Sequence, residues 1–307
     1  MLESSQAAFV TPENPWSAQS IQISPSKVLT AMRDGRAWLV ELPSSRVTAL
    51  SSSAVAAERS SMAASFVEAA ICAGLTQTTH PPGPYTLPRY LRWLAGNYVF
   101  AGQTPGLFRR AVQRFAESGR PDLADFALKK AEEEDGHAEL AGHDLEALGV
   151  PLTETIRAIE PPSASIFADR FRAYVESRTP VALFGFSYCL ERMADRRDEA
   201  FIRSVQAICP PDCPSFRFLK VHSKIGSDHK HVDEQLAFFD SLPPSDLTVI
   251  TCAAYETAEL LDAQSSMDQA LTDEEIGCRL RQAGIPLSFS DTPTREPQRR
   301  TNCSALC

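Results

Sequence analysis

The segment AEEEDGHAELAGHDLEALG, residues 131–149, contains a glutamate and a histidine in the spacing Glu-x-x-His. In a single helix with about 100° per residue, Glu134 and His137 would share a face with the apolar residues Phe126, Ala141 and Leu145. An ionised carboxylate inside a helical core costs several kcal/mol unless it is paired or bound to a metal ion. An inward Glu-x-x-His pair can bind iron or manganese in a helical bundle. A hydrogen-bonded core pair without metal would also fit, and this motif alone leaves both open.

A second inward carboxylate is expected at Glu191. It follows ten residues that carry no charge, in the segment VALFGFSYCLE. On a helix, Glu191 shares a face with Phe184, Ser187 and Tyr188, which is the buried side. Arg192 could pair with it only from a neighbouring face, so Glu191 favours the metal-site interpretation.

A third segment, PSFRFLKVHSKIGSDHKHVDEQLAFFDSL, contributes histidines. If residues 214–242 form one helix, His229 lies within the apolar stripe and His222 lies about 40–60° from its centre. His231 would point away by about 120° and is predicted to be solvated. One metal ion would account for the buried polar residues of all three segments together. Oxygen and imidazole ligands without a thiolate suit iron or manganese better than structural zinc.

These side chains must be positioned by helices, because strand patterns are nearly absent and helical segments alternate with short Pro- and Gly-containing loops. The prediction is an all-α bundle of about seven or more helices. We expect a partly irregular N-terminal extension over residues 1–53, with one short extended piece at AWLVELP. A helical domain would span residues 54–286, and a disordered polar tail residues 287–307.

Composition excludes several classes of function. The net charge of -9 leaves no basic stripe for phosphates, so nucleic acid is not an expected partner. The chain has no apolar run long enough to cross a bilayer, so no membrane is expected either. The start of the chain lacks a basic segment followed by an apolar one, and the expected location is cytoplasmic.

Residues Pro88 to Leu242 resemble the heme-oxygenase-like diiron oxidases. EEEDGHAELAGHDLEALG is similar to the first ligand helix of that family, FGFSYCLE to the second, and FLKVHSKIGSDHKHVDEQLAFF to the third. The resemblance implies a heme-oxygenase-like helical bundle. Carried over residue by residue, it implies the ligands Glu134, His137, Glu191, His222 and His229.

This chain departs from the family pattern at two positions. Gly226 stands where an aspartate is expected four residues after His222, and Asp228 could replace it as a ligand only if the helix is unwound or bulged there. Lys130 stands where some members have a carboxylate. It is a candidate for contacting a substrate carboxylate, although an i,i+4 ion pair with Glu134 would be more ordinary. The first metal site is therefore better supported than the second.

The resemblance implies two Fe(II) ions, the second weakly bound or labile, and O2 as co-substrate. We expect oxidation of a small molecule, with a free aliphatic amino acid as substrate in specialised metabolite biosynthesis. The reaction would be C–H desaturation, ring closure, N-oxygenation or C–C cleavage. A fatty-acid decarboxylase of the same family is an alternative, and a homodimer is left open.

Two further classes of protein would fit the same residues. One is a carboxylate-bridged ferritin-like protein that uses Asp228-x2-His231 as its second motif. The helical geometry disfavours it, because Asp228 and His231 would lie away from the face that carries His229. The second class is a metal-free helical binding or scaffold protein, in which these side chains form a buried polar network.

Overall fold

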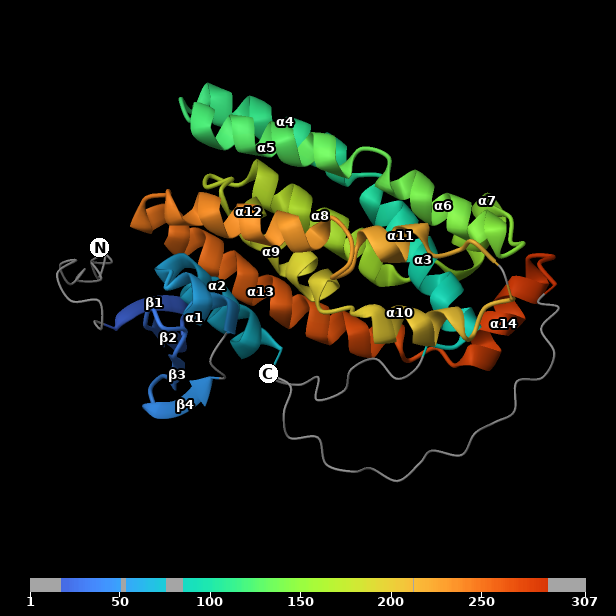
Figure 1. The fold of residues 1–307 in the computed structure, drawn as a ribbon, viewed down its shortest axis with the longest axis horizontal. Helices are drawn as coiled ribbons and strands as arrows, with labels where there is room; N and C mark the ends of the chain where they lie inside the picture. The colour runs from blue at the N-terminus through green and yellow to red at the C-terminus, as the bar shows by residue number, and fades with distance from the viewer. Residues whose placement is uncertain (1–17, 51–53, 76–84, 212, 287–307) are drawn as a thin grey trace.

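Helices make up most of the chain, as the all-α prediction requires (Figure 1). The computed structural model describes residues 18–50, 54–75, 85–211 and 213–286. The predicted polar tail at 287–307 and the first part of the predicted extension lie outside these residues. In chain order the helices are α1 (Ala54–Arg59), α2 (Met62–Gly74), α3 (Leu87–Ala101), α4 (Thr104–Glu117), α5 (Pro121–Glu134), α6 (His137–Ala147), α7 (Leu152–Ile159), α8 (Pro162–Glu176), α9 (Ala182–Asp195), α10 (Glu199–Gln206), α11 (Arg217–Val221), α12 (Asp228–Asp240), α13 (Pro244–Asp268) and α14 (Asp273–Gln282).

A small antiparallel sheet precedes the helices. Its strands pair in chain order, β1 (Gln19–Ser24), β2 (Lys27–Ala31), β3 (Ala37–Glu41) and β4 (Arg46–Leu50). The sequence pattern predicts only one short extended piece here, so the expectation that strands are nearly absent is wrong for this region. Each strand has only five or six residues, and KVLTA and AWLVE contain adjacent apolar residues in place of strict alternation, so the strand signal is weak.

The sheet is fastened to the helical domain through α2 and α13. Its inner face buries Leu29, Ala31 and Leu39 against the bundle. The ammonium of Lys27 hydrogen-bonds to Tyr255 and lies 3.3 Å from Glu259, both on α13. Figure 1 shows the sheet at the opposite end of the molecule from α6, α7 and α14. The sheet is thus a minor addition to an all-α fold.

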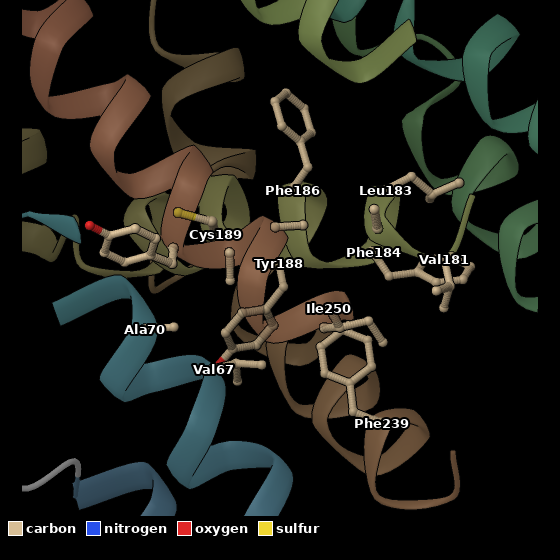
Figure 2. Packing of buried hydrophobic residues seen from close by; sticks show 14 of the residues in the cluster. Val67, Ala70, Val181, Leu183, Phe184, Phe186, Tyr188, Cys189, Phe239 and Ile250 are labelled. Atoms are coloured by element: carbon tan, nitrogen blue, oxygen red, sulfur yellow. The ribbon is translucent and has the colours of Figure 1, made fainter. Parts of the chain in front are cut away.

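Helix α9 runs through the centre of the bundle. Every residue from Ala182 to Cys189 is buried, and α9 packs against α12 and α13 (Figure 2). Burying each large aromatic or aliphatic side chain contributes about 1.5–3 kcal/mol. The run of ten uncharged residues before Glu191 is therefore the buried part of a central helix, and it carries Glu191 into the interior. Within the described residues, no helix is long and apolar enough to span a membrane.

The first ligand segment is two helices and not one. Helix α5 ends at Glu134 and α6 begins at His137, with Gly136 between them at φ +86. This is the left-handed region, which glycine adopts without steric cost. The prediction of one continuous helix over residues 131–149 is wrong because this backbone conformation stops the helix. As a result, Glu134 and His137 occupy the two sides of a helix junction.

The third ligand segment is also interrupted. Helix α11 ends at Val221, and α12 begins only at Asp228. A Cβ atom on Gly226 would lie 2.2 Å from the carbonyl oxygens of both Lys220 and Val221. Only glycine fits this turn. The interruption that Asp228 would need in order to approach the site is therefore present, and the predicted single helix over residues 214–242 is wrong.

Because two backbone carbonyl oxygens lie so close to Gly226, we predict that adding a single methyl group there destabilises the fold. We expect Gly226→Ala to lower the free energy of unfolding by about 1–3 kcal/mol, because the added methyl group must displace backbone. The control is Gly106→Ala in α4, where a Cβ atom would meet nothing within 4 Å. That variant should be more stable by about 0.4–1 kcal/mol. Urea denaturation of both variants measures the difference, and equal stabilities would contradict this account of the turn.

Candidate metal centre

Three side chains meet where helices end. Glu134 is the last residue of α5, His137 the first of α6, and His222 directly follows α11. Their ligand atoms all lie within 4.8 Å of one another. His137 Nδ1 is 3.0 Å from Glu134 Oε2, and the rings of His137 and His222 are nearly perpendicular, with centroids 4.6 Å apart. Two imidazoles and one carboxylate with open positions form the donor set of many non-heme iron sites.

Asp228 orients His222. The Nδ1 atom of His222 lies 3.0 Å from Asp228 Oδ2, and Asp228 is 1% exposed. A carboxylate on one ring nitrogen fixes the tautomer and leaves the second nitrogen free to bind a metal ion. The Nε2 atom of His222 is buried and has no hydrogen-bond partner. Asp228, predicted as a ligand, thus has one oxygen committed to holding a ligand in position.

More unpaired polar atoms lie on the same segment. Asp228 Oδ1, His231 Nδ1 and Gln235 Oε1 are also buried without a hydrogen-bond partner in the part of the chain described. Each such atom costs about 1–3 kcal/mol unless something satisfies it. With Ser227 Oγ and His222 Nε2, five such atoms lie on the segment from His222 to Gln235. The donors present fit a divalent metal ion with open coordination positions.

Glu191 lies inward, as predicted, but its partners are protein groups. Lys130 Nζ is 3.0 Å from Glu191 Oε1, and Glu191 also accepts hydrogen bonds from Gln235 at 2.7 Å and Ser187 at 3.0 Å. Lys130 is 1% exposed and pairs in addition with Glu133 at 2.8 Å. The ion pairs of Lys130 are therefore with Glu133 and Glu191, and the i,i+4 pair with Glu134 is not formed. The ammonium of Lys130 is thus engaged by two protein carboxylates, and its predicted contact with a substrate carboxylate stays a prediction.

Burial and charge act in opposite directions on the acidic groups. Burial alone would raise the pKa of Glu134, but its hydrogen bond with His137 and the nearby His222 outweigh burial and lower that pKa to about 2. For Glu191, burial is the larger effect and raises the pKa to about 7, although the Lys130 ammonium opposes the rise. Burial also lowers the pKa of His222, but Asp228 outweighs it, so the pKa of His222 lies above its usual value.

His229 and His231 have exchanged the positions that helical periodicity predicted. The side chain of His229 is 57% exposed, and its Nδ1 lies 3.0 Å from Asp195 Oδ1. His231 is buried, with Nε2 3.8 Å from Glu133 Oε2 and Nδ1 3.9 Å from Asp228 Oδ1. The prediction that His229 points inward and His231 outward is wrong, because the periodicity of α11 does not continue across residues 222–227. The structure does not bring His229 to the remaining candidate ligands.

The sequence patterns did not single out Glu133 and Gln235, which lie around the centre, and they placed His231 in solvent. A signal for His231 and Gln235 is present in the sequence. Counted from the start of α12, Asp228, His231 and Gln235 fall at positions i, i+3 and i+7 and so share one face. The spacing Asp228-x2-His231, which helical geometry disfavoured when one continuous helix was assumed, therefore does describe residues that face the site.

Comparison with known proteins supports the fold and leaves the reaction open. Neither the protein-family models nor the curated proteins searched include a match to this chain. Among solved structures, a heme oxygenase-like domain of unknown function from Shewanella denitrificans OS217 matches with a TM-score of 0.50 and 17% identity, over 74% of this chain and 90% of that one. A TenA homologue from Pseudomonas syringae pv. tomato DC3000 has a TM-score of 0.48 and 12% identity, over 68% and 88% of the two chains.

A third structure, a CADD-like protein of unknown function from Nostoc punctiforme PCC 73102, has a TM-score of 0.45 and 15% identity, over 74% of this chain and 92% of that one. At such identities the likeness concerns the fold alone, and the evidence for the fold is the match to the Shewanella denitrificans domain. The chain has a heme-oxygenase-like fold, which confirms the predicted fold class.

The raised pKa of His222 predicts that metal binding strengthens as pH rises. A metal ion needs the neutral imidazole, so binding must release the proton that Asp228 helps His222 to retain. We expect the affinity for Fe(II) or Co(II) to fall as pH drops through this pKa, which lies above 6.5. Anaerobic calorimetry between about pH 6 and 8, in buffers of different ionisation enthalpy, counts the protons released.

The matched variant is Asp228→Asn, which removes the charge that raises the pKa of His222. It should flatten this part of the pH dependence and weaken metal binding by about 10–100-fold. Binding that is independent of pH in the unsubstituted protein would contradict the assignment of His222 as a ligand.

Proposed function

We propose that this protein is a non-heme iron enzyme that uses O2 to oxidise a small substrate. The observation that carries the proposal is the Glu134, His137 and His222 triplet, whose ligand atoms lie within 4.8 Å of one another. Two histidines and one carboxylate with open positions are typical of Fe(II) sites that react with O2. The heme-oxygenase-like fold is compatible with this activity but does not specify it.

Iron, when bound, would supply the activation of O2, and the protein would supply position and protection from water. Glu134, His137 and His222 would hold the ion. Asp228, 3.0 Å from His222 Nδ1, would keep the proton of the neutral ring on Nδ1 and leave Nε2 available as a ligand atom. The ring of buried Phe218 lies against His222, with centroids 4.4 Å apart, and gives this candidate ligand an apolar neighbour. Apolar surroundings limit side reactions of oxidising species with water.

Arg197 supports a substrate that carries a carboxylate. Its Nη1 donates a hydrogen bond to the carbonyl oxygen of His222 at 3.3 Å, and its guanidinium lies 5.2 Å from the centre of the Trp93 ring. An arginine fixed in this way beside a metal ligand has further donors to offer, and guanidinium groups bind carboxylates in bidentate fashion. We propose a free aliphatic amino acid as substrate, oxidised by desaturation, ring closure, N-oxygenation or C–C cleavage.

Fe(II)-dependent consumption of O2 tests the reaction. The protein should bind Fe(II) anaerobically and, with substrate present, consume O2 measurably at an oxygen electrode. His137→Ala should reduce the rate at least about 100-fold, since it removes one of three metal ligands. His229→Ala is the matched control, because this histidine is exposed and bonded to Asp195, and the rate should be retained.

A metal-free scaffold protein would give the opposite result. A scaffold would bind no Fe(II), and its melting temperature would not change when Fe(II) is added, whereas specific binding to the folded state raises it. Absence of Fe(II) binding would refute the proposed function.

The substrate class is tested by a panel of amino acids and fatty acids. Because a charge-assisted hydrogen bond contributes about 1.5–3 kcal/mol, Arg197→Met should raise KM for the preferred amino acid by about 10–100-fold, with a smaller effect on kcat. Arg203→Met is the control, since Arg203 is exposed on α10 and pairs only with Glu199 among the described residues. Turnover of fatty acids in preference to amino acids would contradict this substrate assignment.

A further inference from the structure

We propose that the ammonium of Lys130 takes the place of a second metal ion, so that the centre binds one metal ion beside a cation supplied by the protein. The inference rests on the proposed metal centre at Glu134, His137 and His222. It replaces the expectation of two Fe(II) ions by a single ion.

Lys130 makes the contacts that a bridging cation would make. Its Nζ atom lies 3.0 Å and 3.3 Å from the two oxygens of Glu191, which belongs to α9. It lies 2.8 Å from Glu133 Oε2, on α5. The Lys130 side chain is 2% exposed, so bulk water does little to screen its charge from these carboxylates. One positive group thus joins two acidic side chains from two different helices.

The donors around Lys130 would otherwise suit a second ion. Besides Glu133 and Glu191, the donors are Asp228 and His231 of α12. His231 Nε2 lies 3.8 Å from Glu133 Oε2, and His231 Nδ1 lies 3.9 Å from Asp228 Oδ1. Three carboxylates and one imidazole are a common set for iron or manganese between helices. The types of side chain are therefore appropriate for two ions, but the position of the second ion is occupied by the Lys130 ammonium.

The spacing of these donors agrees with occupation by lysine. In the described residues, the Glu134, His137 and His222 group alone gathers three or more potential ligand atoms within 4.8 Å. Glu191 turns its oxygens to Lys130, Gln235 and Ser187. A divalent ion at this position would have to displace the ammonium or lie in contact with it, and like charges repel strongly where water is excluded.

Lys129 provides an internal comparison. It precedes Lys130 in α5, but its side chain is 46% exposed and pairs with Glu234 at 2.6 Å and Glu133 at 3.6 Å. Water can screen that charge, whereas Lys130 has only protein carboxylates as counterions. The two neighbouring lysines therefore separate an effect of the buried ammonium from a general effect of lost positive charge.

The test is the number of metal ions bound by the full-length protein. Apo protein is titrated anaerobically with Fe(II), and separately with Co(II), whose visible absorption reports coordination, and bound metal is counted by elemental analysis. The unsubstituted protein, Lys129→Met and Lys130→Arg should bind one ion per chain. Lys130→Glu, which removes the ammonium and adds a carboxylate, should bind two. Circular dichroism and the melting temperature check that each variant is folded.

Glu191→Gln tests the inference without altering Lys130. If Glu191 pairs with lysine and not with metal, this variant keeps one ion with an affinity within a few-fold of the unsubstituted protein. A loss of 10-fold or more would make Glu191 a metal ligand and overturn the inference. This second measurement decides the matter if Lys130→Glu does not fold.

The outcomes separate the two proposals. Two ions in the unsubstituted protein, or one ion in folded Lys130→Glu, overturn the role of Lys130 and leave the metal centre intact. No bound metal in the unsubstituted protein overturns the metal centre itself, and the inference with it.

Discussion

Negative charge in the interior is the constraint on which the arrangement of this bundle depends. Glu134, Glu191 and Asp228 bring carboxylates into a region where little water can reach them, and each must be compensated locally. The structure does this with different partners: imidazoles for Glu134 and Asp228, and an ammonium for Glu191. The same groups are potential metal ligands, so the arrangement that compensates the buried charges also determines where a metal ion could bind.

The polar centre depends on apolar surroundings that leave it little freedom. Helix α9 is held on several sides by α8, α12 and α13, and its buried aromatic side chains determine where Glu191 lies. The small sheet packs on α2 and α13, which carry none of the candidate ligands. The solved structure that shares this fold is a domain of unknown function, so the chemistry has to be argued from the residues at the centre.

Features that depend on local pattern are predictable from the sequence. The inward position of Glu191 follows from the ten uncharged residues before it, and the helical fold follows from the periodicity of long segments. Features that depend on tertiary contacts are not predictable in this way. Gly226 is needed because two carbonyl oxygens approach it, and this contact interrupts the helix and shifts the face on which His229 and His231 lie. Periodicity counted across such an interruption assigns the wrong residues to the core.

The two helix junctions have a mechanical consequence. Gly136 and Gly226 allow the chain to turn at points that are far apart in the sequence, and the candidate ligands lie beside these turns. A metal ion held by Glu134, His137 and His222 would act as a cross-link between the junction of α5 with α6 and the segment after α11. Such a cross-link restrains the flexible connections of a bundle and adds little to its already packed helices. Loading with metal would then change local motion at the junctions more than it changes the overall fold.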